Sequence, residues 1–102
     1  MILIGKVTEF TDQTSYCLTI NEKQLLLVHH NDHFYLIDNQ CGHFGVPLTD
    51  AQIKNKQIIC AQHGISFNLE TGLVVNRPYE NCEPIKTYSL TKEGGLLYAF
   101  NL

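Results

Sequence analysis

The chain has 102 residues, of which 44% are hydrophobic and 17% charged, so it suffices for one globular domain and is too short for two. A formal net charge of -3 argues against a nucleic-acid partner, because no basic stripe is present to neutralise phosphates. Only three apolar residues stand between Met1 and Gly5. This start predicts neither a signal peptide nor a membrane span, and we therefore expect a cytoplasmic protein.

Short β-type runs, separated by polar turns, follow one another along the chain. The expected strands are Ile2 to Phe10, Tyr16 to Ile20, Gln24 to His29, Phe34 to Asp38, Ile85 to Leu90 and Leu96 to Phe100. Within the third of them, Leu25-Leu26-Leu27-Val28 is a continuous apolar run, which is typical of a strand buried on both faces.

Turn signals complete this pattern. Lys92-Glu93-Gly94-Gly95 lies between the last two expected strands and predicts a hairpin. The one weak helical signal is Pro47 to Lys54, where a single turn could open. We therefore predict one all-β domain over residues 1–102, an antiparallel sandwich or small barrel.

Two short motifs carry the chemistry of this sequence. Cys41-Gly42-His43 is followed, sixteen residues later, by Cys60-Ala61-Gln62-His63. With this content of Cys and His, such a placement arises by chance at a rate of only ~0.003. An iron–sulfur centre with mixed ligands needs this set, because two thiolates hold one iron and two imidazoles hold the other. A structural zinc site is the alternative, although zinc ligands usually come as Cys-x2-Cys and His-x3–5-His.

Each motif begins where an expected strand ends. The run Tyr35 to Asp38 leads into Cys41, and Gln57-Ile58-Ile59 leads into Cys60. This placement predicts two loops that project from a sheet and close on one cluster from opposite sides. We expect them to belong to a small cluster-binding subdomain of about residues 38–84.

The segment from Cys41 to Pro84 resembles a Rieske-type [2Fe–2S] ferredoxin of the kind that serves bacterial ring-hydroxylating dioxygenases. It reads CGHFGVPLTDAQIKNKQIICAQHGISFNLETGLVVNRPYENCEP and contains the family's Pro-Leu-x-Asp segment, its His-Gly-x-x-Phe motif and its Thr-Gly turn. The resemblance implies the Rieske fold, with one [2Fe–2S] cluster per chain. It also implies that Cys41 and Cys60 ligate the inner iron, while His43 and His63 ligate the outer one.

Departures from the high-potential members of this family bear on the reduction potential. Val46 and Gln62 stand where those proteins carry two disulfide-bonded cysteines, and Ile65 and Phe67 stand where they carry a serine and a tyrosine. Hydrogen bonds to cluster sulfurs stabilise the more negative reduced state, so their loss lowers the potential. We therefore expect a potential at the low end of the Rieske range.

The resemblance also implies a function. It is that of a soluble electron carrier, not an enzyme in itself, that passes single electrons from an NAD(P)H-dependent flavoprotein reductase to a terminal oxygenase. A transient carrier is expected to be a monomer with no membrane partner. Two alternatives remain at this point: a small Rieske-like subunit of a nitrite-reductase-type enzyme, and a zinc-binding structural module.

The remaining cysteines and histidines receive simpler interpretations. Cys17 is expected as a small buried strand residue and Cys82 as a loop residue, both with structural thiols. His29, His30 and His33 lie close together in sequence, but their strand and turn context favours solvated side chains over a second metal site.

Overall fold

The computed structural model describes residues 1–40, 47–49, 51–61, 64–75, 83–100 and 102. It confirms the predicted all-β fold with antiparallel pairing. The strands in the described residues are β1 (Ile2–Lys6), β2 (Thr14–Ile20), β3 (Lys23–His30), β4 (His33–Asp38), β5 (Gln52–Lys54), β6 (Gln57–Ile59), β7 (Ser66–Asn68), β8 (Thr87–Tyr88), β9 (Leu90–Glu93) and β10 (Leu96–Ala99), and a 3-10 helix, η1, spans Val7–Glu9. Among these described residues, no helix is long and apolar enough to span a membrane.

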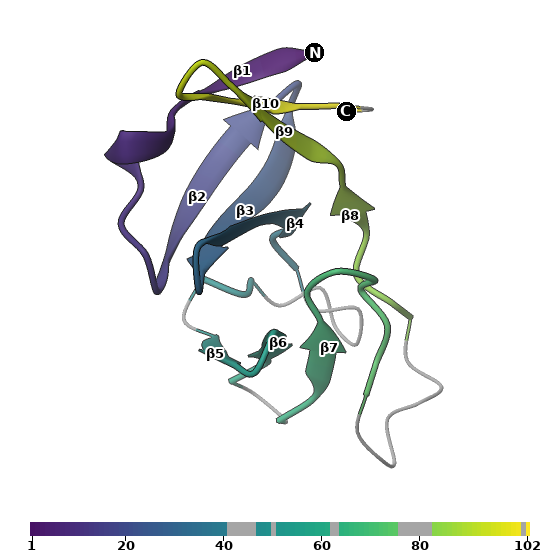
Figure 1. Ribbon diagram of the computed structural model, residues 1–102. Coiled ribbons are helices and arrows are strands. Elements are labelled where there is room, and N and C mark those ends of the chain that lie inside the picture. The colour runs from purple at the N-terminus through teal and green to yellow at the C-terminus, as the bar shows by residue number, and fades with distance from the viewer. Residues whose placement is uncertain (41–46, 50, 62–63, 76–82, 101) are drawn as a thin grey trace.

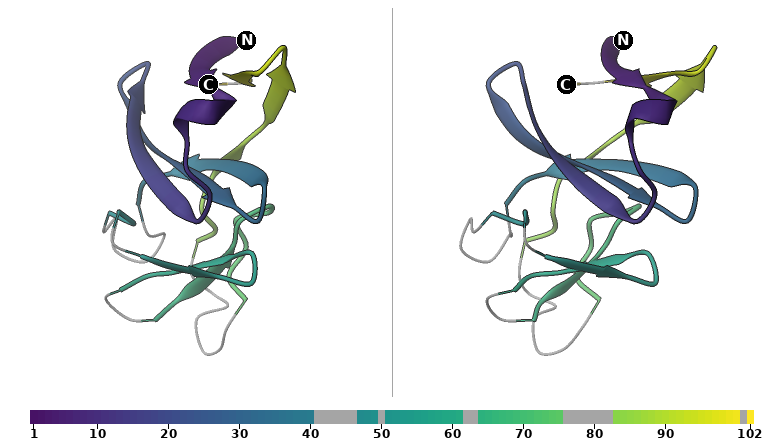
Figure 2. Two further views of the ribbon diagram at one scale, coloured as in Figure 1. Left: turned by 60° about the vertical axis from the view of Figure 1, so that its left-hand side comes forward. Right: turned by 90° about the vertical axis from the view of Figure 1, so that its left-hand side faces the viewer.

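The strands form three sheets that are stacked along the long axis of the molecule (Figures 1 and 2). The sheet at one end has the order β1-β10-β9, the middle sheet has the order β2-β3-β4-β8, and the sheet at the other end has the order β5-β6-β7. Both chain termini lie at the β1-β10-β9 end (Figure 1). The β5-β6-β7 sheet is therefore the part of the fold farthest from the termini.

The middle sheet is covered on both faces, which explains the apolar run in β3. Side chains alternate between the faces of a strand, and consecutive residues of β3 accordingly enter two separate cores. One core lies against β5-β6-β7 and contains Leu26, Val28, Tyr35 and Ile37. The other lies against β1-β10-β9 and contains Leu25, Leu27 and Leu36. The expectation that Leu25 to Val28 is buried on both faces is confirmed, since all four are 0% exposed.

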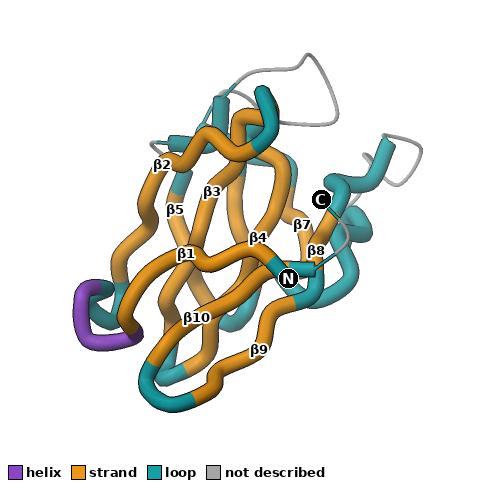
Figure 3. The backbone as a smooth tube through the Cα atoms, turned by 90° about the horizontal axis from the view of Figure 1, so that it is seen from above, coloured by secondary structure: helices purple, strands orange, loops and turns teal. Residues whose placement is uncertain are grey.

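The β9-β10 hairpin covers the middle sheet from the side of the termini. Viewed from above, β1, β10 and β9 cross over the strands of that sheet (Figure 3). The predicted turn is confirmed: Glu93 pairs with Leu96, and the two glycines between them have φ angles of +56° and +78°. Positive φ at both central residues is what a tight two-residue hairpin turn requires, and glycine adopts it without strain.

Some expected strands are shorter or divided. The first ends at Lys6, where the Lys6 amide donates to Glu9 Oε1 at 2.8 Å and the chain turns into η1 instead of remaining extended to Phe10. The expected strand Ile85 to Leu90 divides into β8 and the start of β9, which pair in different sheets. Of the weak helical signal over Pro47 to Lys54, a single turn is present, in which the Ala51 amide donates to the Leu48 carbonyl at 3.0 Å. Gln52–Lys54 forms β5 instead, because it pairs with β6.

Candidate metal centre

The second Cys/His motif begins directly after β6, as the sequence predicted. Cys60 is 2% exposed and belongs to the core between the middle sheet and β5-β6-β7. Its amide donates to the Ile65 carbonyl at 2.8 Å, and the Gly64 amide donates to the Cys60 carbonyl at 2.9 Å. Gly64 has a φ of +68°, which lets the chain reverse there. Main-chain hydrogen bonds thus close the base of this loop, with Cys60 held inside and Ala61 exposed.

The base of the first loop is closed by a side chain. β4 ends at Asp38, and the next residue, Asn39, accepts a hydrogen bond from the Leu48 amide at its Oδ1 atom, at 2.8 Å. Its Nδ2 atom donates to Thr49 Oγ1 at 3.2 Å. Leu48 is 1% exposed and lies in the same core as Cys60 and Ile65. The residues at the bases of the two loops therefore pack in the same buried core.

Of the four predicted ligands, Cys60 is described by the structure. Cys41, His43 and His63 lie outside the described residues, as do Val46, Gln62 and Cys82. Within the described part of the chain, no group of three or more His, Cys, Asp or Glu side chains gathers to hold a metal ion. The ligand set Cys41, His43, Cys60 and His63 thus remains a prediction.

A tyrosine holds the end of β4, just ahead of the first loop. Tyr88 Oη donates to Asp38 Oδ1 at 2.6 Å, and the Asp38 amide donates to the Lys86 carbonyl at 3.0 Å. Burial, followed by the hydrogen bond to Asp38, raises the pKa of Tyr88, so the phenol keeps its proton near neutral pH. The ammonium groups of Lys23 and Lys86 each lie 5.4 Å from the centre of the Tyr88 ring. These contacts give the first loop a fixed starting point.

The environment of Cys60 suits a metal-bound thiolate. Its core neighbours include Ile58, Ile65 and Phe67, which keep water away from the sulfur. A bound metal ion holds a coordinating thiol as its thiolate. Cys60 is a free cysteine at the base of a tight loop, so its sulfur is available for such a bond.

Residues 1–89 match the family model of the Rieske [2Fe-2S] domain. The chain belongs to the Rieske family. This match confirms the resemblance seen in the sequence and the [2Fe–2S] cluster that the resemblance implies. It also favours the mixed ligation of a Rieske centre, with His in place of two Cys on one iron, over the structural zinc site.

Rieske-domain relatives include proteins of very different length. Apoptosis-inducing factor 3 of human and mouse is 35% identical over 49 residues, which are 48% of this chain and 8% of those proteins. The ferredoxin component of an alkene monooxygenase system from Xanthobacter autotrophicus is 31% identical, covering 74% of this chain and 61% of that protein. The corresponding component of a naphthalene 1,2-dioxygenase system from Pseudomonas aeruginosa is 30% identical, with 76% and 72% covered. The chain thus spans less than a tenth of the first two relatives.

Solved Rieske structures share the fold. The ferredoxin of Sphingomonas yanoikuyae B1 superposes with a TM-score of 0.83 at 27% identity, covering 96% of this chain and 95% of that one. A chain from a complex of reduced oxygenase and oxidized ferredoxin in carbazole 1,9a-dioxygenase has a TM-score of 0.83 at 20% identity, with 96% and 99% covered. Both matches confirm the Rieske-type antiparallel fold predicted from the sequence.

Two predictions about residues outside the Rieske motifs are wrong. Cys17 is exposed, because it lies on the edge strand β2 opposite Leu26, and there its Sγ atom lies 3.3 Å from Thr49 Oγ1. His29 and His30 are buried, at 9% and 8% exposed, because both faces of β3 are covered up to its end. The ring of His29 stacks on Phe34 at 4.0 Å, and its Nδ1 atom lies 2.9 Å from the Phe10 carbonyl.

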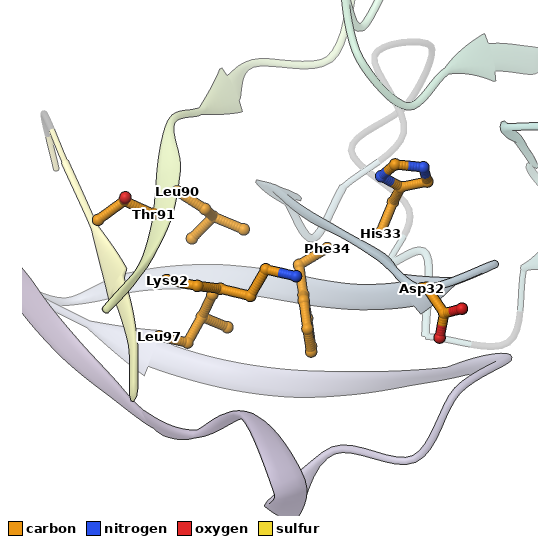
Figure 4. Close-up of a pocket in the computed structure, with 7 residues that line it drawn as sticks. All are labelled: Asp32, His33, Phe34, Leu90, Thr91, Lys92 and Leu97. Carbon is orange, nitrogen blue, oxygen red and sulfur yellow. The ribbon is translucent and has the colours of Figure 1, made fainter. Parts of the chain in front are cut away.

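His33 is exposed, as predicted. It lines a shallow hollow of about 180 Å³ between β4 and the β9-β10 hairpin, together with Asp32, Phe34 and Lys92 (Figure 4). The Lys92 ammonium lies 5.8 Å from the centre of the Phe34 ring. Cys60, the predicted ligand that the structure describes, does not line this hollow.

Proposed function

We propose that the chain is a low-potential Rieske ferredoxin that carries single electrons from an NAD(P)H-dependent flavoprotein reductase to a terminal oxygenase. The observation that carries this proposal is the match to the Sphingomonas ferredoxin along 96% of this chain and 95% of that one. The ferredoxin components of the alkene monooxygenase and naphthalene dioxygenase systems support it. Its role is that of an electron-transfer component and not of an enzyme.

In this proposal Cys41, His43, Cys60 and His63 hold the cluster, within a cluster-binding subdomain of about residues 38–84. A bound Rieske cluster supplies a site for one electron. The chain itself keeps Cys60 away from water, at 2% exposed. Pro47, Ala61 and Gly64 are exposed at the described ends of the two loops. An exposed rim beside a buried thiol is suited to a carrier that docks briefly on its partners.

A cytoplasmic, monomeric carrier is part of the same proposal. The exposed thiol of Cys17 supports a reducing compartment, because exposed free thiols persist where glutathione and thioredoxin keep them reduced. The carbazole dioxygenase relative occurs in a complex of oxygenase and ferredoxin, which supports an oxygenase as the electron acceptor.

The proposal is tested by reduction of the cluster-loaded protein. NADH and a flavoprotein reductase from a ferredoxin-dependent oxygenase system should reduce it by one electron, with a midpoint near the low end of the roughly −150 to +300 mV Rieske range. A strongly positive midpoint would contradict the low-potential assignment. Retention of a large reductase subunit through a high-salt wash would favour the nitrite-reductase-type alternative instead.

Residues near Cys60 give a prediction about the potential. Ile65 and Phe67 are both 0% exposed and offer no side-chain donor. Ile65→Ser and Phe67→Tyr each add a hydroxyl whose hydrogen bond to the cluster would be stronger in the reduced state. A difference of about 1.4 kcal/mol between the two redox states raises the midpoint by about 60 mV. Anaerobic redox titration followed by EPR measures this shift.

The control for this prediction is Ile65→Val, which removes one methylene group and adds no donor. It should titrate like the parent protein. The potential-tuning account is contradicted if Ile65→Ser and Ile65→Val have the same midpoint while both retain a full cluster.

A further inference from the structure

The clearest unassigned feature of the site is the set of contacts made by Asn39. Its main-chain amide donates to the Gln24 carbonyl at 2.9 Å, which anchors Asn39 to the start of β3. Its side chain binds Leu48 through Oδ1 at 2.8 Å and Thr49 through Nδ2 at 3.2 Å. One side chain thus joins the end of β4 to two residues that lie nine and ten positions later.

These contacts bracket the first loop. Cys41 and His43 lie between Asn39 and Leu48 in the sequence, so the chain that carries them has both ends fixed by the same amide group. Holding the ends of a loop together removes conformations that would place its ligands elsewhere. In the second loop, main-chain bonds between Cys60, Gly64 and Ile65 close the base.

The contacts of Asn39 also connect the two halves of the site. Leu48 is 1% exposed and shares its core with Cys60 and Ile65. The bond from Leu48 to Asn39 therefore ties the end of β4 to the buried core that contains the second cysteine. Asparagine suits this position because its short side chain offers both an acceptor and donors.

We propose that Asn39 is a positioning residue for the Rieske cluster, which sets the first ligand loop in register with the buried Cys60. This inference rests on the proposed function, since it takes Cys41 and His43 as ligands. In this proposal Asn39 acts on both ligands through the base of the loop.

The test compares Asn39→Ala with Asn68→Ala in the cluster-loaded protein. Asn68 is a matched control, because its Oδ1 atom accepts the Glu70 and Thr71 amides at 2.8 and 3.1 Å. It lies at the end of β7 that pairs with Gln57, away from Cys60. Asn39→Ala should release iron to a chelator about tenfold faster than the parent. Loss of a residue that supports metal ligands weakens metal binding by about tenfold or more. It should also change the EPR spectrum of the reduced cluster.

A conservative variant separates positioning from general stability. Asn39→Asp keeps the acceptor for Leu48, and the Thr49 hydroxyl can rotate to donate to the second carboxylate oxygen. It should restore slow iron release and the parent EPR line shape. Asn68→Ala should leave both unchanged even where it lowers the melting temperature.

Either of two results would overturn the inference. One is an Asn39→Ala protein with the iron-release rate and EPR spectrum of the parent. The other is an Asn68→Ala protein that releases iron as fast as Asn39→Ala, which would assign the effect to global stability. Failure of the proposed function is distinct from both, since the cluster-loaded parent protein would then not be reduced by NADH and the reductase, whatever its iron-release rate.

Discussion

Replacing Cys60 with alanine should give a folded protein that holds no [2Fe–2S] cluster. The sulfur of Cys60 is buried among apolar side chains at the base of the second loop, so no water or surface side chain can take its place as a ligand. Alanine leaves a small cavity in this core, which costs about 1 kcal/mol of folding free energy. Iron and sulfide analysis after reconstitution, together with the visible spectrum, measures the loss.

The matched control is Ala99→Gly, which leaves a small cavity in the core on the other face of the middle sheet, away from Cys60. Ala99→Gly should retain the full cluster. Equal loss of iron in both variants, or a full cluster in Cys60→Ala, would remove Cys60 from the ligand set.

The second large effect is expected at Gly72, where Gly72→Ala should destabilise the fold by about 3 kcal/mol. A Cβ atom at this position would lie 1.8 Å from the Ile85 carbonyl oxygen, and the φ angle is +77°. The same backbone is held by hydrogen bonds, because the Gly72 amide donates to the Asn68 carbonyl at 2.7 Å and the Ile85 amide donates to the Gly72 carbonyl at 2.8 Å. The free energy of unfolding in urea measures the change.

Gly94→Ala separates the two causes at Gly72. Gly94 also has a positive φ, +56°, but a Cβ there would meet nothing within 4 Å. It should therefore lose only the backbone-strain part, about 1 kcal/mol. If Gly72→Ala is no less stable than Gly94→Ala, the close approach of Gly72 to Ile85 has no energetic importance.

The features that sequence analysis predicted correctly are those set by local pattern. The apolar run Leu25 to Val28 predicted that both faces of β3 are buried, and the two cores bury them. The paired glycines at 94 and 95 required a tight turn, and their φ angles match it. Cys60 follows β6 directly, as the two isoleucines that precede it in the sequence indicated.

The features that sequence analysis missed depend on contacts between distant parts of the chain. β5 and β7 have three residues each, too few for a periodic signal, and they form strands because they pair with β6. The sequence around His29 and His30 does not indicate that they are buried, yet the packing of two sheets on β3 shields them from water. Asn39 is of a residue type that is common in loops, so the sequence does not indicate its contacts. The fold brings it to its partners, which lie nine and ten positions later in the sequence.

We infer that this chain holds a Rieske cluster and uses it to carry electrons. The most direct measurement is iron, sulfide and zinc analysis of the anaerobically purified protein, with EPR spectra before and after dithionite. We expect two irons and two sulfides per chain, as the [2Fe-2S] family requires, and a reduced-state signal typical of mixed His and Cys ligation. Zinc alone, with no colour and no EPR signal after reconstitution, would contradict it.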